Sequence, residues 1–598
     1  MANRKNRTGA EQINWDLSDL YEGVEDPRIQ QDKQRIRDLA DQFSKKYRTM
    51  VLDFSPAEMR EALSEYEKIH DLSGRVGAFA YLIWTTNTED ATYGKLVQEM
   101  NEFSSEISQK LVFFDLEWLD MEEALAANFI HHPELARYRH YLETSRQFKP
   151  HKLDEKEEQL LSAKSVTGSR AWIRYFDETL GAARFELDGQ LLTEQEVLSK
   201  IHEPDRQLRK RAAESVTAKL KDLSRSTTFV FNTLVADKYT NDKFRNFPGW
   251  ITGRNLSNEI SDESVESLIQ SVTSRYDLPQ RFYNLKKRLL GLEELMEYDR
   301  YAPIEETVTR INWTEAKGMV LDSYSRFHPE LGGIASRFFD NNWIDAAIKP
   351  GKRGGAYSAG TVPSAHPYVF MNYDGKIRDV QTLAHELGHG VHQYLSRDQG
   401  VLQAHTPLTT AETASVFGEM LVFQNILKSM QDPKEQLSLL VGKIDDTIAT
   451  VFRQISMNRF EDALHRARRM EGELTTGRIS ELWIRTQKEL YGSSVTLTPD
   501  YEIWWSYIPH FIHTPGYVYA YAFGELLVLA LYEQYTRKPD GFSDKYMDLL
   551  KAGGSDWPEN LLAKMDMDIN SVDFWKNGLH TIETMIQQAE TLAGQVQK

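Results

Sequence analysis

The sequence contains no cysteine among its 598 residues. Disulfides, thiolate metal ligands and cysteine nucleophiles are therefore all excluded, and the chain is compatible with a reducing compartment. No run approaches the roughly 18–20 consecutive apolar residues of a membrane span, because the most apolar stretch, LLVLALY at 526–532, is short. Basic residues near the N-terminus are not followed by an apolar segment, so a signal peptide is not expected. We therefore expect a cytoplasmic protein that does not enter a membrane.

Glycine and proline are sparse, at 34 and 19 residues, and strand-like alternation is rare. The best strand candidates are 184–192, with an Asp188-Gly189 hairpin turn, and YVFMNYDG at 368–375. Ser55 followed by Pro56 is a helix-start signal for 55–70. Similar amphipathic segments cover about 28–48, 77–113, 154–165, 192–201, 207–240, 261–291, 314–327, 433–470 and 478–490. The sequence therefore predicts a mostly α-helical protein with a small β element.

The formal net charge is −18, so the chain repels a phosphate backbone and a nucleic acid is not expected as a partner. The length suits several domains or one large multi-lobed body. A boundary between domains is expected near 145–155 (SRQFKPHKLDE), because this segment is polar and contains a proline.

Residues 385–389 read HELGH, the HExxH pattern of zinc peptidases. Side chains four positions apart lie on one helix face, so the imidazoles of His385 and His389 can reach one ion. Glu386 lies at the flank of that face, where it can take a proton from the attacking water. The alternative interpretation is that these are solvated surface histidines.

At about 100° per residue, the histidines of this helix lie roughly opposite its apolar face. They therefore face a cavity, another element or water. His392 shares their side, but three ligands within two turns of one straight helix would not surround an ion tetrahedrally. We interpret His392 as a residue that contacts a metal ligand or the substrate rather than the metal itself. Leu395 stands where metzincins have their third histidine, which excludes that class. The apolar face comprises Val380, Leu383, Ala384, Leu387, Val391, Tyr394 and Leu395.

A third protein ligand is needed, and the apolar segment 406–427 offers two acids, Glu412 and Glu419, seven positions apart. Buried carboxylates require a cation or several donors. One alternative for Glu412 is a capping box beginning at Thr409, but this does not explain Glu419. A metal bound by Glu412, with Glu419 orienting a ligand histidine, explains both.

Tyrosines and histidines crowd the segment WWSYIPHFIHTPGYVYAYAFGEL at 504–526. An aromatic core is one interpretation. The other is a set of hydrogen-bond donors for the oxyanion that develops during amide hydrolysis. Tyr517, Tyr519 and Tyr521 alternate after Pro515-Gly516, as expected for a loop that runs into a helix.

HELGHGVH, AETASVFGE and IPHF…GYVYAYAFGE, in that order and at these distances, resemble the oligoendopeptidase F branch of the thimet oligopeptidase family. The resemblance covers the chain well from about residue 200 onward. INWDLSDLYEG at 13–23 and GKRGGAYS before the motif also match the branch.

The resemblance implies a mostly helical, two-lobed ellipsoid with a deep substrate channel and a small β element beside the active-site helix. It implies an N-terminal helical lobe at 1–200 and a catalytic region at 201–598. The implied activity is zinc-dependent endopeptidase cleavage of short oligopeptides, with one Zn²⁺ per chain. The implied roles are metal ligands His385, His389 and Glu412, general base Glu386, transition-state donors His510, Tyr517 and Tyr521, and a cleft border at Gly355, Ala356 and Tyr357.

Two other functions stay open at this point. A helical zinc dipeptidyl carboxypeptidase could have the same ligand set. A catalytically silent peptide-binding protein could use zinc structurally, although such a site does not need the base Glu386.

Overall fold

The computed structural model of the chain describes residues 8–304 and 310–596. The chain divides into two compact units, each built from segments that are not consecutive. Unit 1 comprises Met1–Lys149, Val308–Ser429 and Gln534–Asp568, and unit 2 comprises Pro150–Thr307, Met430–Glu533 and Ile569–Lys598. The division of the chain at residue 200 stays a prediction, whereas these units are defined by contacts within the fold.

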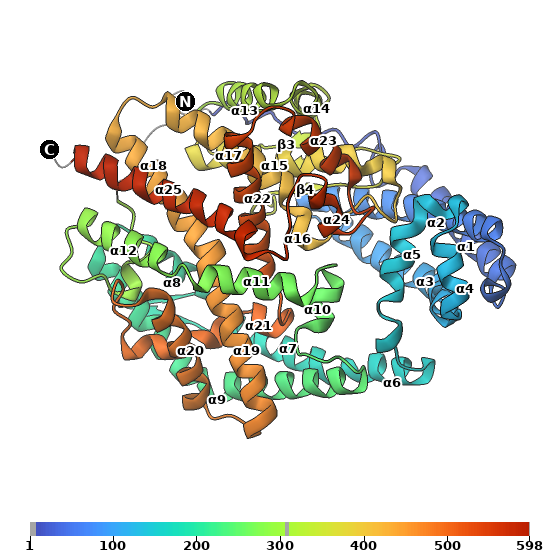
Figure 1. Cartoon of the computed structure of the whole chain (residues 1–598), viewed down its shortest axis with the longest axis horizontal. Helices are drawn as coiled ribbons and strands as arrows, with labels where there is room; N and C mark the ends of the chain where they lie inside the picture. Colours follow the sequence, from blue (N-terminus) through green and yellow to red (C-terminus); the bar gives the residue numbers. More distant parts are fainter. Residues whose placement is uncertain (1–7, 305–309, 597–598) are drawn as a thin grey trace. The chain divides into compact units, whose positions relative to one another are not determined.

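Helices dominate both units, which confirms the predicted fold class (Figure 1). No helix among the described residues is both long and apolar enough to cross a membrane. The α-helices of unit 1 are α1 (Pro27–Tyr47), α2 (Pro56–Thr86), α3 (Ala91–Asp120), α4 (Glu123–Ile130), α5 (Arg139–Arg146), α13 (Trp313–Phe327), α14 (Pro329–Asp340), α15 (Ile377–Ser396), α16 (Leu408–Ala411), α17 (Thr413–Ser429), α23 (Phe542–Ala552) and α24 (Pro558–Ala563).

Unit 2 is likewise helical, and α22 (Tyr519–Arg537) begins in it. Its α18 (Pro433–Ile448) and α19 (Gln454–Glu471) are joined by the π-helical segment Ala449–Arg453. The other helices are α6 (Glu155–Ser165), α7 (Ser169–Ala182), α8 (Glu194–Ser199), α9 (Arg206–Phe244), α10 (Thr252–Ser257), α11 (Asp262–Thr273), α12 (Asp277–Leu289), α20 (Thr476–Tyr491), α21 (His510–His513) and α25 (Val572–Val596), with a 3₁₀ segment η9 (Pro499–Tyr507).

Two predicted helices are each divided in the structure. The segment 77–113 is broken between α2 and α3, where the Asp90 carboxylate accepts the backbone N–H of Thr92 and starts a new helix. The segment 261–291 is broken between α11 and α12. Residues 87–90 of the first break contain no proline or glycine, whereas Pro279 lies in the first turn of α12 and accounts for the second break, because proline cannot continue a preceding helix.

The β structure is as small as predicted. In unit 2, β1 (Phe185–Leu187) and β2 (Gln190–Leu192) form the expected hairpin, in which Asp188 and Gly189 both have positive φ, at 52° and 81°. Unit 1 has one three-stranded sheet in the order β3-β5-β4. Its strands are β3 (Ile344–Asp345), β4 (Tyr357–Ala359) and β5 (Tyr368–Phe370), and β4 is antiparallel to β5.

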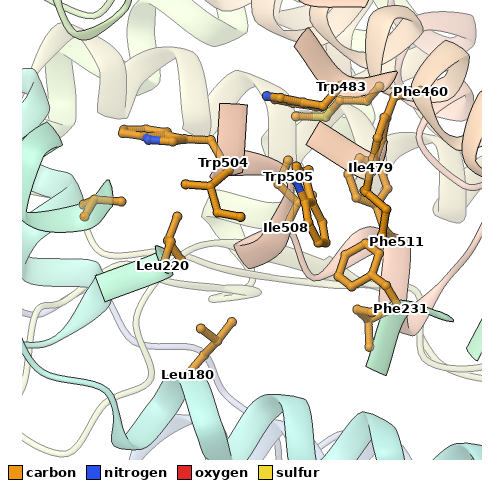
Figure 2. Packing of buried hydrophobic residues seen from close by; sticks show 14 of the residues in the cluster. Leu180, Leu220, Phe231, Phe460, Ile479, Trp483, Trp504, Trp505, Ile508 and Phe511 are labelled. Carbon is orange, nitrogen blue, oxygen red and sulfur yellow. The ribbon is translucent and has the colours of Figure 1, made fainter. Parts of the chain in front are cut away.

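A large aromatic core holds η9 and α21 in place in unit 2 (Figure 2). The ring of Trp505 lies 4.7 Å from that of Phe231 on α9, and the ring of Phe511 lies 5.2 Å from that of Phe460 on α19. The Trp505 indole N–H donates to the Ser480 hydroxyl at 3.1 Å, so its polar atom is also satisfied. This core fixes the chain on both sides of His510.

Candidate active site

Helix α15 presents the HELGH motif with the register that the sequence predicts. Its first turn is fixed by Asp379, whose carboxylate accepts the backbone N–H groups of Asp374 and Lys376 at 2.9 and 3.0 Å. The predicted apolar face is buried, with the exception of the half-buried Tyr394. His385 and His389 are only partly buried, with side-chain exposures of 27% and 20%.

Glycines allow α15 and α17 to approach closely, and the two helices lie beside each other in Figure 1. A Cβ atom on Gly388 would lie 2.4 Å from the carbonyl oxygen of Ala414. A Cβ atom on Gly418 would lie 2.1 Å from the hydroxyl of Tyr324, which itself donates to the carbonyl of Ala384. Small residues at these contacts therefore bring the acids of the 406–427 segment to the histidines.

Three potential metal ligands converge at this contact. One ligand atom each from His385, His389 and Glu412 lies within 4.8 Å of the others. Glu412 Oε2 lies 3.3 Å from His385 Nε2 and 3.4 Å from His389 Nε2. Two atoms bound to one tetrahedral zinc ion at about 2.0–2.1 Å are separated by about 3.3–3.4 Å. The donor set and its spacing therefore fit zinc.

Glu412 lies at the junction of α16 and α17, so the apolar segment 406–427 is not one continuous helix. No side-chain cap forms at the start of α16, and the Glu412 carboxylate instead accepts the Ser415 hydroxyl at 2.6 Å. Burial alone would raise the pKa of Glu412, but the hydrogen bond and charge of His389 lower it to about 2. Glu412 is thus ionised, as a metal ligand must be.

Glu419 contacts the opposite side of the His385 ring. His385 Nδ1 donates to Glu419 Oε2 at 3.2 Å, which directs Nε2 toward Glu412. Burial alone would lower the pKa of His385, but the Glu419 hydrogen bond and the neighbouring carboxylates raise it to about 9. A carboxylate behind a histidine fixes the ring's tautomer and orientation, as is usual for metal-binding histidines.

Glu386, the acid of the HELGH motif, is buried, with 8% of its area exposed. Burial raises the pKa of its carboxyl, against the opposing effects of His385 and His389. The backbone of Ser358 also acts on the pKa of Glu386, so strand β4 passes beside this carboxylate. A buried carboxyl with a raised pKa next to a potential metal site is suited to accept and return a proton.

His392 does not join the other two histidines. It lies outside the group of potential ligands and is only 6% exposed. Burial, with a smaller effect of His389, lowers the pKa of His392 to about 4, so its imidazole is neutral. Little of its surface is available to a substrate.

The predicted cleft border, Gly355 to Tyr357, leads into the edge strand β4. Gly355 has a φ of +84° and its carbonyl accepts the Asn372 side-chain amide at 3.0 Å. The Tyr357 hydroxyl contacts the Thr85 hydroxyl at 2.6 Å, and its ring stacks on Phe370 at 4.9 Å. The Tyr357 side chain thus anchors β4.

The predicted donors His510, Tyr517 and Tyr521 form a cluster of their own in unit 2. His510 Nε2 lies 3.2 Å from the Tyr521 hydroxyl. The ring of Tyr517 is 5.0 Å from that of Tyr521 and 6.3 Å from that of His510. Burial lowers the pKa of His510, so the ring is neutral near pH 7 and can share a hydrogen with Tyr521. The cluster can offer hydroxyl and imidazole donors to a ligand.

The loop that holds Tyr517 is fixed by a hydrogen bond to the buried carboxyl group of Glu461. The backbone N–H of Gly516, whose φ is +76°, donates to Glu461 Oε1 at 2.9 Å. Burial raises the pKa of Glu461 to about 8. Tyr519 points elsewhere: it is fully buried, accepting from Asn258 at 2.9 Å and donating to Asn255 at 2.7 Å. It is therefore a structural tyrosine.

Comparison with known proteins decides the family. The model of peptidase family M3 matches residues 199–581, more than half of the chain, and the oligopeptidase F model matches residues 117–185. The chain belongs to peptidase family M3. This confirms the resemblance seen in the sequence motifs and makes the chain a peptidase.

Relatives within family M3 align over nearly the whole chain. Oligopeptidase PepF of Bacillus subtilis is 27% identical over 595 residues, which cover 98% of this chain and 88% of the relative. Oligoendopeptidase F of Lactococcus lactis subsp. cremoris, encoded on a plasmid, is 25% identical over 607 residues and covers 99% of each chain.

Solved structures agree on the fold. A crystal structure from Chlamydophila abortus has a TM-score of 0.86 at 25% identity and covers 98% of this chain and 100% of its own. Oligoendopeptidase-F from Enterococcus faecium has a TM-score of 0.71 at 21% identity, covering 95% and 99%. The helical fold is thus shared with these solved structures.

Several residues that support the candidate metal group in unit 1 or the His510 cluster in unit 2 were not anticipated from the sequence: Gly388, Ser415, Gly418 and Tyr324 in unit 1, and Glu461 in unit 2. Gly388 and Gly418 are local signals, because a helical glycine at a buried position indicates close packing. Ser415 bonds Glu412 three positions away, whereas Tyr324 and Glu461 act through contacts with segments distant in the sequence, which their identity alone does not reveal.

Proposed function

We propose that this chain is a zinc-dependent endopeptidase that cleaves internal bonds of short oligopeptides, with one Zn²⁺ held by His385, His389 and Glu412. The observation that carries the proposal is the spacing of the three ligand atoms, together with Glu419 behind His385. The names of the relatives, oligopeptidase and oligoendopeptidase, support oligopeptides as substrates. One ion would supply a Lewis acid that polarises the scissile carbonyl and lowers the pKa of water.

In this mechanism Glu386 moves the proton. Its carboxylate accepts a proton from the attacking water and returns it to the leaving amine. The raised pKa of Glu386 favours holding that proton between the two steps. Glu419 keeps the His385 ring in its tautomer, and Ser415 holds the Glu412 carboxylate in position.

Hydrogen-bond donors for the developing oxyanion are proposed to come from His510, Tyr517 and Tyr521. Their mutual contacts leave hydroxyl groups in a polar cluster rather than in an aromatic core. Such a donor stabilises charge that appears only in the transition state.

The substrate backbone is proposed to pair with the edge strand β4, next to Gly355 and Ala356. An extended peptide can add to an exposed sheet edge through main-chain hydrogen bonds, and β4 is an edge strand whose backbone passes beside Glu386. His392, which the sequence suggests as a substrate contact, would act here only through its neighbours because of its burial.

A cytoplasmic location is proposed because a chain without cysteine suits a reducing compartment. Fractionation of the producing cell would recover the protein with cytoplasmic markers, and recovery with secreted proteins would contradict this.

Digestion of a defined peptide mixture tests the function. Mass spectrometry of products should show internal cleavage of peptides of roughly ten residues, loss of cleavage with a chelator, and recovery on adding zinc. Glu386→Gln should retain zinc yet lose turnover by at least the ~10²–10⁴-fold typical of general-base assistance. Chelator-resistant cleavage, or an active Glu386→Gln protein, would refute the proposal.

A further inference from the structure

A groove in unit 1 lies on the side of α15 that faces away from the candidate metal group. It is formed by α14, by α23 and by the end of α15 with the 3₁₀ turn η7 (Arg397–Gln399), and its cavity has a volume of about 520 Å³. Helices α14 and α23 both contact α15 (Figure 1). Tyr394, which lines the groove, lies about 140–180° around the helix from His389 and His385. The groove is therefore separate from the three potential metal ligands.

Two arginines from different elements meet at Tyr394 in this groove. The Arg337 guanidinium, on α14, donates to the Tyr394 hydroxyl. The Arg397 guanidinium, on η7, lies 3.6 Å from the centre of the Tyr394 ring and donates to the Tyr394 carbonyl at 2.6 Å. Arg337 is exposed and Arg397 is half-buried. Both guanidinium groups are thus held close to one ring while they stay accessible from solution.

Positive charge is in excess in the groove, although the whole chain has a net charge of −18. Neither Arg337 nor Arg397 forms an ion pair with a carboxylate within residues 8–304 and 310–596. Lys551 of α23 pairs with Glu330 of α14 at 2.9 Å, so these two charges offset each other. The other acid of the groove, Asp398, is a single negative charge beside two arginines. The groove is therefore suited to an anion.

Hydrogen-bond donors in the groove also exceed the acceptors. A guanidinium has five N–H donors, and in the described part of the chain Arg337 and Arg397 each use one of them, on Tyr394. Because the Tyr394 hydroxyl accepts from Arg337, its own hydrogen can be donated to a ligand. These donors approach the cavity from α14, α15 and η7, so a ligand with several acceptor oxygens fits them.

Space for such a ligand is left by a glycine. Gly333 lines the groove one helical turn before Arg337 on α14, and a Cβ atom added to it would meet no atom within 4 Å. The neighbouring lining residues Ile334 and Leu395 are buried and offer an apolar surface. The volume of the cavity lies within the roughly 300–1,000 Å³ of small-molecule sites.

We infer that this groove binds a phosphate group, either free or carried by a small molecule. Arginine forks bind phosphate oxygens in pairs. A tetrahedral phosphate can also accept from donors that approach in several directions, as Arg337, Arg397 and the Tyr394 hydroxyl do, whereas a planar carboxylate offers two oxygens. The inference does not depend on the proposed peptidase function, because it concerns a separate site and is tested by binding alone.

Calorimetric titration of the full-length, zinc-loaded protein tests the site. Inorganic phosphate and AMP are the phosphate probes, and succinate is the carboxylate probe. Wild type should bind one molecule of a phosphate probe per chain and should bind succinate at least tenfold more weakly. Tighter binding of AMP would identify a phosphorylated small molecule as the ligand, and equal or tighter binding of inorganic phosphate would identify the free ion.

Substitutions in the groove then locate the bound phosphate. Arg337→Gln and Arg397→Gln should each weaken binding by at least tenfold, the loss expected for one charge-assisted hydrogen bond. Gly333→Leu should also weaken it, because the added side chain occupies open space in the cavity. Arg326→Gln is the matched control, since Arg326 is exposed on α13 of the same unit and pairs with Asp322 at 2.8 Å. This control should bind the probes as wild type does.

Three results would overturn the inference. They are a wild-type protein that binds neither phosphate probe saturably at millimolar concentrations, succinate binding as tight as phosphate binding, and unchanged binding in all three groove variants. In the last case the phosphate would be bound elsewhere, for example at the zinc ion. The melting temperature of each variant shows whether it is folded. Should Arg397→Gln fail to fold, Arg337→Gln and Gly333→Leu still decide the outcome.

Discussion

At the scale of single residues, the imidazole ring of His385 is held by a carboxylate on each side. One ring nitrogen donates to Glu419 and the other faces Glu412, so the ring cannot rotate without losing a contact. Glu419 itself lies outside the group of three potential ligands. Its role at the proposed metal site is therefore to orient His385.

Glu419→Ala should keep zinc binding but weaken it by about 10–100-fold, the usual cost of removing a carboxylate behind a metal-binding histidine. Competition with a chromogenic chelator would measure the change in dissociation constant. An unchanged constant would show that Glu419 does not orient His385.

Among the three tyrosines after Gly516, substitution of Tyr517 or Tyr521 should affect catalysis, and substitution of Tyr519 should affect stability. Tyr521→Phe or Tyr517→Phe should lower kcat by about 10²–10³-fold for the variant that removes an oxyanion donor, with little change in melting temperature. Tyr519→Phe removes buried hydrogen bonds to Asn258 and Asn255. It should lower the free energy of unfolding by about 1–3 kcal/mol while leaving kcat near wild type. Steady-state kinetics with thermal unfolding would check this, and full activity in both Tyr517→Phe and Tyr521→Phe would transfer the donor role to His510 or His513.

At the scale of elements, the close contact of α15 with α17 decides whether Glu412 reaches the histidines. Gly388→Ala would place a methyl group against the backbone of Ala414 and Ser415. Overpacking of this kind costs about 1–3 kcal/mol, and the displaced helix should also lose zinc affinity.

The control for that substitution is Gly318→Ala in α13 of the same unit, where an added Cβ atom meets nothing within 4 Å. It should be neutral or stabilising, by about 0.5–1 kcal/mol, since alanine is the better helix former. Zinc titration and thermal unfolding of both variants would test the contact. If Gly388→Ala and Gly318→Ala have the same zinc affinity and the same melting temperature, the close contact of α15 with α17 is not required for the site.

The register of α15 could be predicted because its apolar residues repeat with the period of a helix and the HELGH spacing follows from that period. The role of Glu412 could be inferred only as one of two alternatives, since its neighbours Thr409 and Thr410 also fit a helix cap. The interruption of the helix at Glu412 depends on contacts with His385, His389 and Ser415, and no local pattern encodes them. The helix breaks after Thr86 and Thr273 do have local signals, the Asp90 cap and Pro279, but the periodic pattern of apolar residues continues across both breaks.

At the scale of the whole molecule, each unit is assembled from separate stretches of chain. The segment Met1–Lys149 belongs to the same unit as α15 and α17, and so does Gln534–Asp568. The core of unit 1 is therefore complete only when these segments are present together.

A fragment of residues 1–200 expressed alone should consequently fail to unfold cooperatively, because it lacks the unit 1 segments 308–429 and 534–568. Thermal unfolding followed by near-ultraviolet circular dichroism would show this directly. A sharp transition and resistance to proteolysis in the fragment would instead support an independent N-terminal domain ending near residue 200.

The most direct test of the account is the zinc content of the purified Glu412→Ala protein, measured beside wild type and His392→Ala by elemental mass spectrometry after dialysis against a weak chelator. Wild type and His392→Ala should each contain one zinc ion per chain, and Glu412→Ala should contain almost none, because it loses one of three protein ligands. A full complement of zinc in Glu412→Ala would contradict the account.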